Sequence, residues 1–169
     1  MKKTVLAFIG LFLCLAVFGQ TLDDQYGKDV ESIAAIIDAY YEVISGSSED
    51  PWQFERDKFL HSANAVIIRL DDEGNAAFNS LEAEYIPMGL NPREDLYEIE
   101  LKREVRHFGN IGQVWSAFEI RKDPEVPTNL RGLNSIQLHY EKGRWYIDSW
   151  TVQMESIDNL LVEEFLNGQ

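Results

Sequence analysis

The chain has 169 residues, of which 45% are hydrophobic, 12% aromatic and 26% charged. This composition is typical of a globular protein, and the length suits one domain with a substantial core. The 29 acidic residues outnumber the 15 Lys and Arg residues and give a net charge of −14. Such an acidic chain is not expected to bind nucleic acid or an anionic membrane surface.

The first residues have the layout of a secretory signal peptide. A basic start precedes the apolar segment 4–18, which carries no charge and is shorter than the roughly 20 residues of a membrane span. Small side chains precede Gln20 and allow cleavage there. We therefore expect residues 1–19 to be removed and residues 20–169 to form one exported domain, periplasmic or secreted. An uncleaved membrane anchor is the alternative.

Metal and cofactor chemistry has little support in the sequence. The one cysteine, Cys14, lies in the predicted signal peptide, so the exported domain would have neither a disulfide nor a thiolate metal site. The three histidines do not form a His-x-x-x-His pair, and there is no glycine-rich phosphate loop. We expect no metal and no cofactor.

Helices are predicted in the first half of the chain. Apolar residues recur at three- and four-residue spacing from Val30 to Ile44, and this helix is expected to end near Ser45 and Gly46. Asp50 and Pro51 have the residue types of an N-cap and a first helical position, which predicts a second, short helix.

A hairpin and a third helix are expected next. Residues 64–70 predict a strand, and an acidic turn leads into a short return strand at 76–78. Ser80 is expected to cap a helix that ends near Ile86, because Pro87 breaks the helical pattern.

From Leu96 the hydrophobic period changes to two, which predicts two long antiparallel hairpins and then a short C-terminal helix. The expected elements span residues 96–107, 111–121, 133–140, 144–153 and 157–165. Helices early and hairpins late predict an α+β domain.

Three sequence blocks carry a family resemblance. They are FGNIGQVWSAFE at 108–119, RGLNSIQL at 131–138 and GRWYIDSW at 143–150. These blocks resemble the last strands of the nuclear transport factor 2-like superfamily, which includes SnoaL-like polyketide cyclases and ketosteroid isomerases, and the element order matches over residues 26–156. The resemblance implies a cone-shaped, strongly curved antiparallel sheet around the N-terminal helices, an apolar pocket and a homodimer. It identifies a fold and no particular reaction.

Polar residues on an apolar strand face are the candidates for catalysis. Strict alternation pairs His107 with Gly112, Val105 with Val114, Arg103 with Ser116 and Leu101 with Phe118. This register places Arg103, His107 and Ser116 on the apolar face. There Arg103 would hold an anionic or carbonyl oxygen, and His107 would move a proton. In the alternative, His107 lies in solvent at the hairpin end and Arg103 pairs with a structural carboxylate.

The second hairpin has two faces of different character. We assign the more apolar face to the pocket, which gives a set of expected ligand contacts: Tyr40, Ser116, Phe118, Asn134, Tyr140, Trp145 and Ser149. The other face is aromatic and partly polar, as at a dimer interface, and the expected interface residues are Trp115, Gln137, His139, Tyr146 and Trp150. The alternative exchanges the faces and places Tyr146, Asp148 and Trp150 in the pocket.

One departure from the resemblance concerns ketosteroid isomerases, whose reaction needs an acidic base after the second helix. Matching residues 59–63 to that segment places Ile67 at the base position, so no carboxylate stands there. Tyr40 could replace the tyrosine of the first helix. His61 is expected at the surface, at the end of a helix.

Three functions remain open at this point. The first is an exported, non-catalytic domain that binds a small, partly apolar molecule. The second is a lyase, isomerase or cyclase with His107 as general base and Arg103 as oxyanion stabiliser. The third is a dimeric structural or interaction protein.

Overall fold

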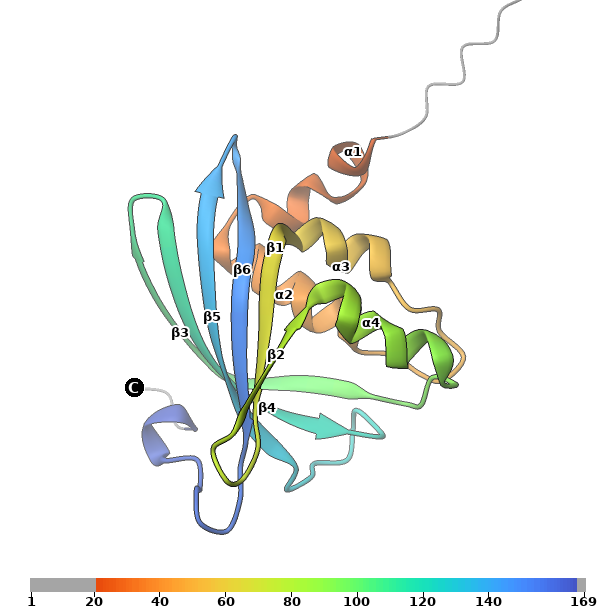
Figure 1. The fold of residues 1–169 in the computed structure, drawn as a ribbon, viewed down its shortest axis with the longest axis vertical. Helices are drawn as coiled ribbons and strands as arrows, with labels where there is room; N and C mark the ends of the chain where they lie inside the picture. Colours follow the sequence, from red (N-terminus) through yellow and green to blue (C-terminus); the bar gives the residue numbers. More distant parts are fainter. Residues whose placement is uncertain (1–20, 167–169) are drawn as a thin grey trace, which may run out of the picture.

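The computed structural model describes residues 21–166. The predicted signal peptide, residues 1–19 with Cys14, lies outside the described residues. A six-stranded sheet has the order β2-β1-β6-β5-β4-β3, and helices α1–α4 lie together on one side of it (Figure 1). The α+β class is confirmed. The sheet is antiparallel except for β1 and β6, which run parallel.

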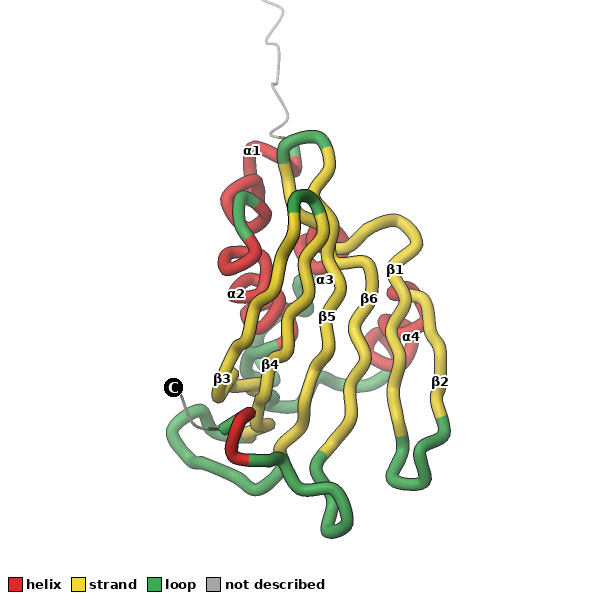
Figure 2. Tube along the Cα trace, turned by 90° about the vertical axis from the view of Figure 1, so that its left-hand side faces the viewer, coloured by secondary structure: helices red, strands yellow, loops and turns green. Residues whose placement is uncertain are grey.

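The helical elements are α1 (Leu22–Tyr26), η1 (Gly27–Val30), α2 (Ile33–Ile44), α3 (Phe54–Leu60), α4 (Leu81–Leu90) and η2 (Glu163–Phe165). The strands are β1 (His61–Leu70), β2 (Ala76–Ser80), β3 (Tyr97–Phe108), β4 (Ile111–Arg121), β5 (Arg131–Glu141) and β6 (Arg144–Met154). Both predicted long hairpins are confirmed, and Figure 2 shows their strands side by side in the sheet.

Local side-chain bonds decide where the first helices begin. The Ser32 hydroxyl accepts a hydrogen bond from the Ala35 amide at 3.1 Å, so α2 begins after this cap, three residues later than Val30. The predicted cap at Asp50 is wrong. Its carboxylate instead accepts hydrogen bonds from the Ser47 amide and hydroxyl, at 2.8 and 2.9 Å, and α3 begins only at Phe54.

Helix α4 continues through its proline. The predicted Ser80 cap is confirmed, because its hydroxyl accepts from the Ala83 amide at 3.3 Å. The predicted end near Ile86 is wrong, since α4 runs through Pro87 to Leu90. The last turn is closed by Asn91, whose amide and side chain both donate to the Pro87 carbonyl, at 3.2 and 2.7 Å.

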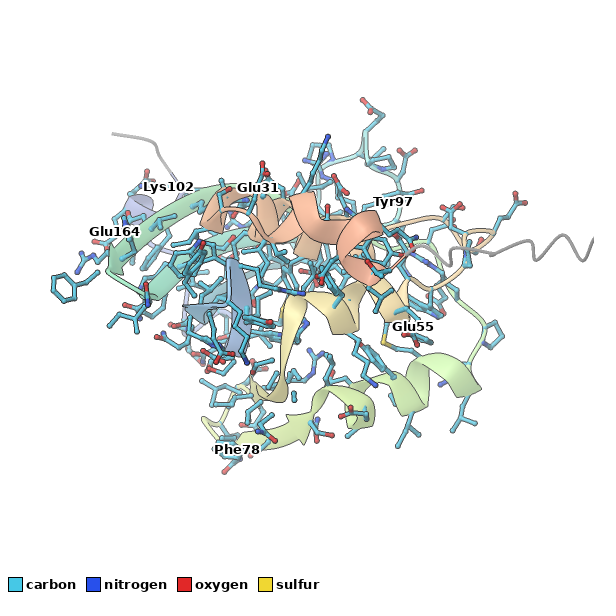
Figure 3. The ribbon with its side chains drawn as sticks, turned by 90° about the horizontal axis from the view of Figure 1, so that it is seen from above. Glu31, Glu55, Phe78, Tyr97, Lys102 and Glu164 are labelled. Atoms are coloured by element: carbon cyan, nitrogen blue, oxygen red, sulfur yellow. The ribbon has the colours of Figure 1, made fainter. Side chains whose placement is uncertain are left out.

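The C-terminal segment lies on the side of the sheet away from the helices (Figure 1). The predicted helix over 157–165 is wrong, because it is replaced by a bridge between Ser156 and Asn159 and by the single turn η2. The Phe165 ring lies 5.7 Å from the Trp115 ring. Figure 3 shows Glu164 beside Lys102, whose ammonium donates to the Glu164 carbonyl.

One extra residue changes the face of β3. The predicted pairs of His107, Val105 and Arg103 are confirmed. The predicted pair of Leu101 with Phe118 is wrong, because Glu100 pairs with Phe118 and Leu101 forms a β-bulge. Before the bulge the alternation is therefore shifted by one residue. Glu98 and Glu100 share the face of Phe118, and Ile99 and Leu101 do not.

A second bulge changes the face of β6. Gln137 pairs with Ser149 and Leu138 with Ile147, so Asp148 is the extra residue. Ser149 therefore lies on the outer face, whereas Trp150 lies on the inner face and is 8% exposed. The inward placement of Trp145 and Ile147 is confirmed. Neither predicted assignment of the faces is right as a whole, because Trp150 points inward and Tyr146 does not.

The core lies between α2, α3 and the inner face of the sheet. The sheet is strongly curved, and the first part of β3 runs beneath the helices (Figure 1). Core residues from α2 include Ile36 and Ile37, and the strands add Val114, Phe118 and Ile136, each at most 1% exposed. A cavity remains at the end of the sheet that α4 covers.

Candidate functional site

A cavity of about 520 Å³ lies between the inner face of the sheet and helices α2, α3 and α4. Its aromatic walls come from Tyr40 of α2, Trp52 of the following loop, Tyr85 of α4 and Trp150 of β6. Its polar lining residues are Asp57, Arg69, Asn79, Glu84, Glu98 and Asn134. A few polar groups in a largely aromatic and aliphatic wall are typical of small-molecule sites.

Glu98 is the acid that the bulge in β3 turns into this cavity. Its Oε2 atom is sealed from solvent and has no hydrogen-bond partner among the described residues. Burial raises the pKa of Glu98 to about 7, although the positive charge of Arg69 opposes this rise. A carboxyl group with such a pKa can accept or donate a proton near neutral pH.

Asp57 of α3 is the second acid in the cavity wall. The Tyr85 hydroxyl donates to its Oδ2 atom at 2.9 Å, which ties α4 to α3. Burial raises the pKa of Asp57, and the nearby His61 opposes this rise. His61 is 5% exposed, with Nδ1 3.3 Å from Asp57 Oδ1. The predicted surface position of His61 is therefore wrong.

A buried hydrogen-bond network orients the Asn134 side chain. Arg103 donates to both oxygens of Glu100, at 2.9 and 2.6 Å, and the Ser116 hydroxyl also donates to this carboxylate. Tyr41 OH lies 2.6 Å from Ser116 Oγ, and Asn134 Nδ2 donates to Tyr41 OH at 3.4 Å.

The direction of this network follows from its end, because an ionised carboxylate only accepts hydrogen bonds. Ser116 therefore donates to Glu100, Tyr41 donates to Ser116, and Asn134 must offer its amide nitrogen to Tyr41. The Asn134 Oδ1 atom remains, and this buried acceptor has no hydrogen-bond partner among the described residues. Asn134 lines the cavity.

Arg69 stands at the wall formed by β1. Its guanidinium donates to Glu84 at 2.6 and 3.1 Å and lies 5.1 Å from the centre of the Trp150 ring. The Trp150 ring in turn lies 6.0 Å from that of Tyr40. The Trp150 Nε1 atom is buried and has no hydrogen-bond partner in the described part of the chain.

The two predicted catalytic residues do not line this cavity. His107 is exposed near the end of the hairpin. Arg103 is 17% exposed and pairs with Glu100 and Asp38, with N–O distances of 2.6 and 2.7 Å. These are the positions given by the alternative interpretation of the sequence, and a catalytic role for either residue stays a prediction.

The predicted ligand contacts are divided between several environments. Tyr40 and Asn134 line the cavity. Ser116, Phe118 and Trp145 are buried and are absent from its lining. Tyr140 is 36% exposed. The inward placement of Ser149 is wrong, because the bulge at Asp148 turns it to the outer face.

The predicted dimer interface is also divided. On the outer face, His139 stacks on Tyr146 with a ring separation of 5.0 Å and lies beside the exposed Gln137. Trp115 is in contact with Phe165. The outward placement of Trp150 is wrong because it is buried. A dimer through the remaining residues stays a prediction.

Sequence reasoning missed Glu98, Asp57 and Tyr85. No local signal marks the bulge at Leu101, because the shift exchanges two apolar residues for two glutamates on the inner face. Within residues 21–166 there is no cluster of three or more residues suited to binding a metal ion. The helices of this same segment are all too short or too polar to cross a bilayer.

The raised pKa of Glu98 predicts how stability depends on pH. Its pKa is about 7 in the folded chain, against 4.5 for an unperturbed glutamate. Between these values the folded state binds more protons, so the free energy of unfolding falls as pH rises, by up to about 3 kcal/mol. Glu98→Gln should lack this part of the fall, as measured by urea denaturation between pH 4.5 and 8.

The matched control is Glu125→Gln, which removes an exposed carboxylate from a loop. It should leave the wild-type pH dependence in place. Parallel curves for the wild type and Glu98→Gln would show that the Glu98 carboxyl is not destabilised by burial.

No protein-family model matches the chain, and no curated protein does either. Solved structures do match it. A protein of unknown function from Shewanella baltica, described as nuclear transport factor 2-like, aligns with a TM-score of 0.54 at 13% identity, over 82% of this chain and 99% of its own.

Two further similar structures carry proposed activities. A proposed dehydratase of the nuclear transport factor 2-like family from Streptomyces avermitilis has a TM-score of 0.55 at 12% identity, over 80% of this chain and 99% of its own. A proposed ketosteroid isomerase from Shewanella frigidimarina has a TM-score of 0.53 at 13% identity, over 73% and 96%. At these identities the likeness concerns the fold, and this chain has the nuclear transport factor 2-like fold.

Proposed function

We propose that the chain binds a small, partly apolar molecule in the cavity beside α4. The observation that carries this proposal is a set of unpartnered polar atoms in residues of the cavity wall: Glu98 Oε2, Asn134 Oδ1 and Trp150 Nε1. Each buried, unpaired polar atom costs about 1–3 kcal/mol. A ligand that pairs with them would recover part of this cost, and a volume of about 520 Å³ suits a small organic molecule.

Helix α4 is the wall through which a ligand would enter. Of its residues only Leu81 is buried, whereas Ile86 and Leu90 are 62% and 79% exposed. The few apolar contacts of this helix make it easier to displace than the core helix α2. The hydrogen bond from Tyr85 to Asp57 holds it against the cavity.

We also propose that the domain acts after export from the cytoplasm. The basic start and the apolar segment 4–18 support this location. Assembly into a homodimer through the outer face of the sheet is part of the same proposal and rests on the aromatic residues there.

Filling the cavity from α4 should abolish binding. Ala83 lines the cavity, and Ala83→Trp would place a large ring in it. The matched control is Ile86→Trp on the same helix, at a position that is 62% exposed. Titration with the neutral fluorescent probe N-phenyl-1-naphthylamine should show binding to the wild type and to Ile86→Trp, and at least about tenfold weaker binding to Ala83→Trp.

Circular dichroism spectra would confirm that both tryptophan variants are folded. Equal affinity of the probe for folded Ala83→Trp and for the wild type would rule out this cavity as the binding site.

A second candidate function is proton transfer by Glu98. It is supported by the pKa of about 7 and by the place of this carboxyl in the wall of an aromatic cavity. Two similar structures are a proposed dehydratase and a proposed ketosteroid isomerase, and both reaction types require proton transfer. Ile67, at the family's expected base position, is fully buried and apolar, so Glu98 of β3 would supply the carboxylate from another strand.

A general probe of a buried base is the ring opening of 5-nitrobenzisoxazole. A carboxylate takes the C–H proton while the ring N–O bond breaks, giving a coloured cyanophenolate. The rate should rise with pH through a midpoint near 7 and fall about 100-fold or more in Glu98→Gln. Glu125→Gln should keep the wild-type rate. An unchanged rate in Glu98→Gln would exclude this role.

A further inference from the structure

We infer that the ligand of this cavity carries a protonated amine or another organic cation beside its apolar part. This inference rests on the proposed function and adds the chemical class of the ligand. It follows from the charges, the unpartnered acceptor atoms and the aromatic rings that converge on one cavity.

Acidic side chains outnumber basic ones in the wall of the cavity. Asp57, Glu84 and Glu98 are the acidic lining residues, and Arg69 is the basic one. Arg69 is engaged by Glu84, with N–O distances of 2.6 and 3.1 Å. Asp57 has His61 beside it, with Nδ1 3.3 Å from Asp57 Oδ1, so Glu98 is the carboxyl of the lining that no basic side chain pairs with directly among the described residues. A cationic ligand would supply the missing positive charge.

Most of the buried, unpartnered polar atoms of the wall are hydrogen-bond acceptors. Oδ1 of Asp57, Oδ1 of Asn134 and Oε2 of Glu98 are buried and without a hydrogen-bond partner in the described residues. Asp57 is 8% exposed and Asn134 is 1% exposed. All three atoms accept hydrogen bonds, so the ligand should be rich in donors. An ammonium group has three donors and no acceptor.

The orientation of the Asn134 side chain determines which of its two polar atoms stays unpaired. The Asn134 amide nitrogen donates to Tyr41, which continues the chain of hydrogen bonds through Ser116 to Glu100. The Asn134 side-chain atom that stays unpaired is therefore the oxygen. The buried unpartnered atoms of the lining are therefore mostly acceptors, and Trp150 Nε1 is the single buried donor without a partner among the described side chains of the lining.

Aromatic rings form a large part of the wall. The electron-rich faces of aromatic rings attract cations, and the Trp150 ring already has the Arg69 guanidinium 5.1 Å from its centre. Tyr40 and Tyr85 add two further rings to the lining. The net charge of −14 favours the approach of a cation over that of an anion.

Three probes that share a phenylethyl group distinguish a cationic ligand from a neutral or an anionic one. They are 2-phenylethylamine, 2-phenylethanol and 3-phenylpropionate, which at pH 7.5 are cationic, neutral and anionic. Isothermal titration calorimetry of the purified protein should show the amine binding at least about tenfold more tightly than the alcohol or the carboxylate, which corresponds to about 1.4 kcal/mol.

Two glutamine variants show whether the preference comes from the cavity. Glu98→Gln should weaken binding of the amine by at least about tenfold and leave the alcohol unchanged. The matched control is Glu82→Gln, which removes the same charge from an exposed site on α4 outside the cavity lining. It should keep the wild-type preference. Spectra of both variants would confirm folding.

Tighter or equal binding of the alcohol or the carboxylate would overturn the inference, as would an amine preference that survives in Glu98→Gln. Absence of binding by all three probes would overturn it as well. If N-phenyl-1-naphthylamine still binds the wild type and is excluded by Ala83→Trp in any of these cases, the proposed small-molecule site stands and only the cationic ligand class is lost.

Discussion

The candidate site depends on one extra residue in β3. Leu101 has no partner of its own on β4, so the alternation of the strand shifts there by one position. The part of β3 that runs beneath the helices (Figure 1) therefore turns glutamates inward, where strict alternation expects apolar residues. Burial of acidic side chains is costly unless they are paired. The two inward glutamates differ in how far hydrogen bonds and ion pairs offset this cost.

Glu100 and Glu98 lie two residues apart and share the inner face, yet their surroundings differ. Glu100 is satisfied by Arg103 and Ser116, and it fixes Tyr41 and Asn134 in turn. Glu98 lines the cavity, has a buried and unpartnered oxygen, and has a raised pKa. Arg103 and Ser116 thus support the wall of the cavity from within the core, and Glu98 is the group that is free to meet a ligand.

The sequence predicted the fold well because long amphipathic elements have strong periodicity. The stripe of α2, the two hairpins and the Ser80 cap all follow from local patterns. The faces of the strands were predicted correctly only up to the bulges. Leu101 and Asp148 each shift the alternation, and no local pattern in the sequence marks either bulge. The faces predicted for Glu98 and Trp150 were consequently wrong. The hydrogen bond from Tyr85 to Asp57 joins α4 to α3, and no local pattern predicts such a contact.

The bulge at Leu101 buries the Glu98 carboxyl in the wall of the cavity. Carbon-13 NMR of the side-chain carboxyl groups, with the Glu98 signal assigned from its absence in Glu98→Gln, measures this directly. The account predicts a titration midpoint near 7 for that signal, as burial requires. A midpoint near 4.5, the value of an unperturbed glutamate, would contradict the account, because it would mean that the carboxyl is open to water.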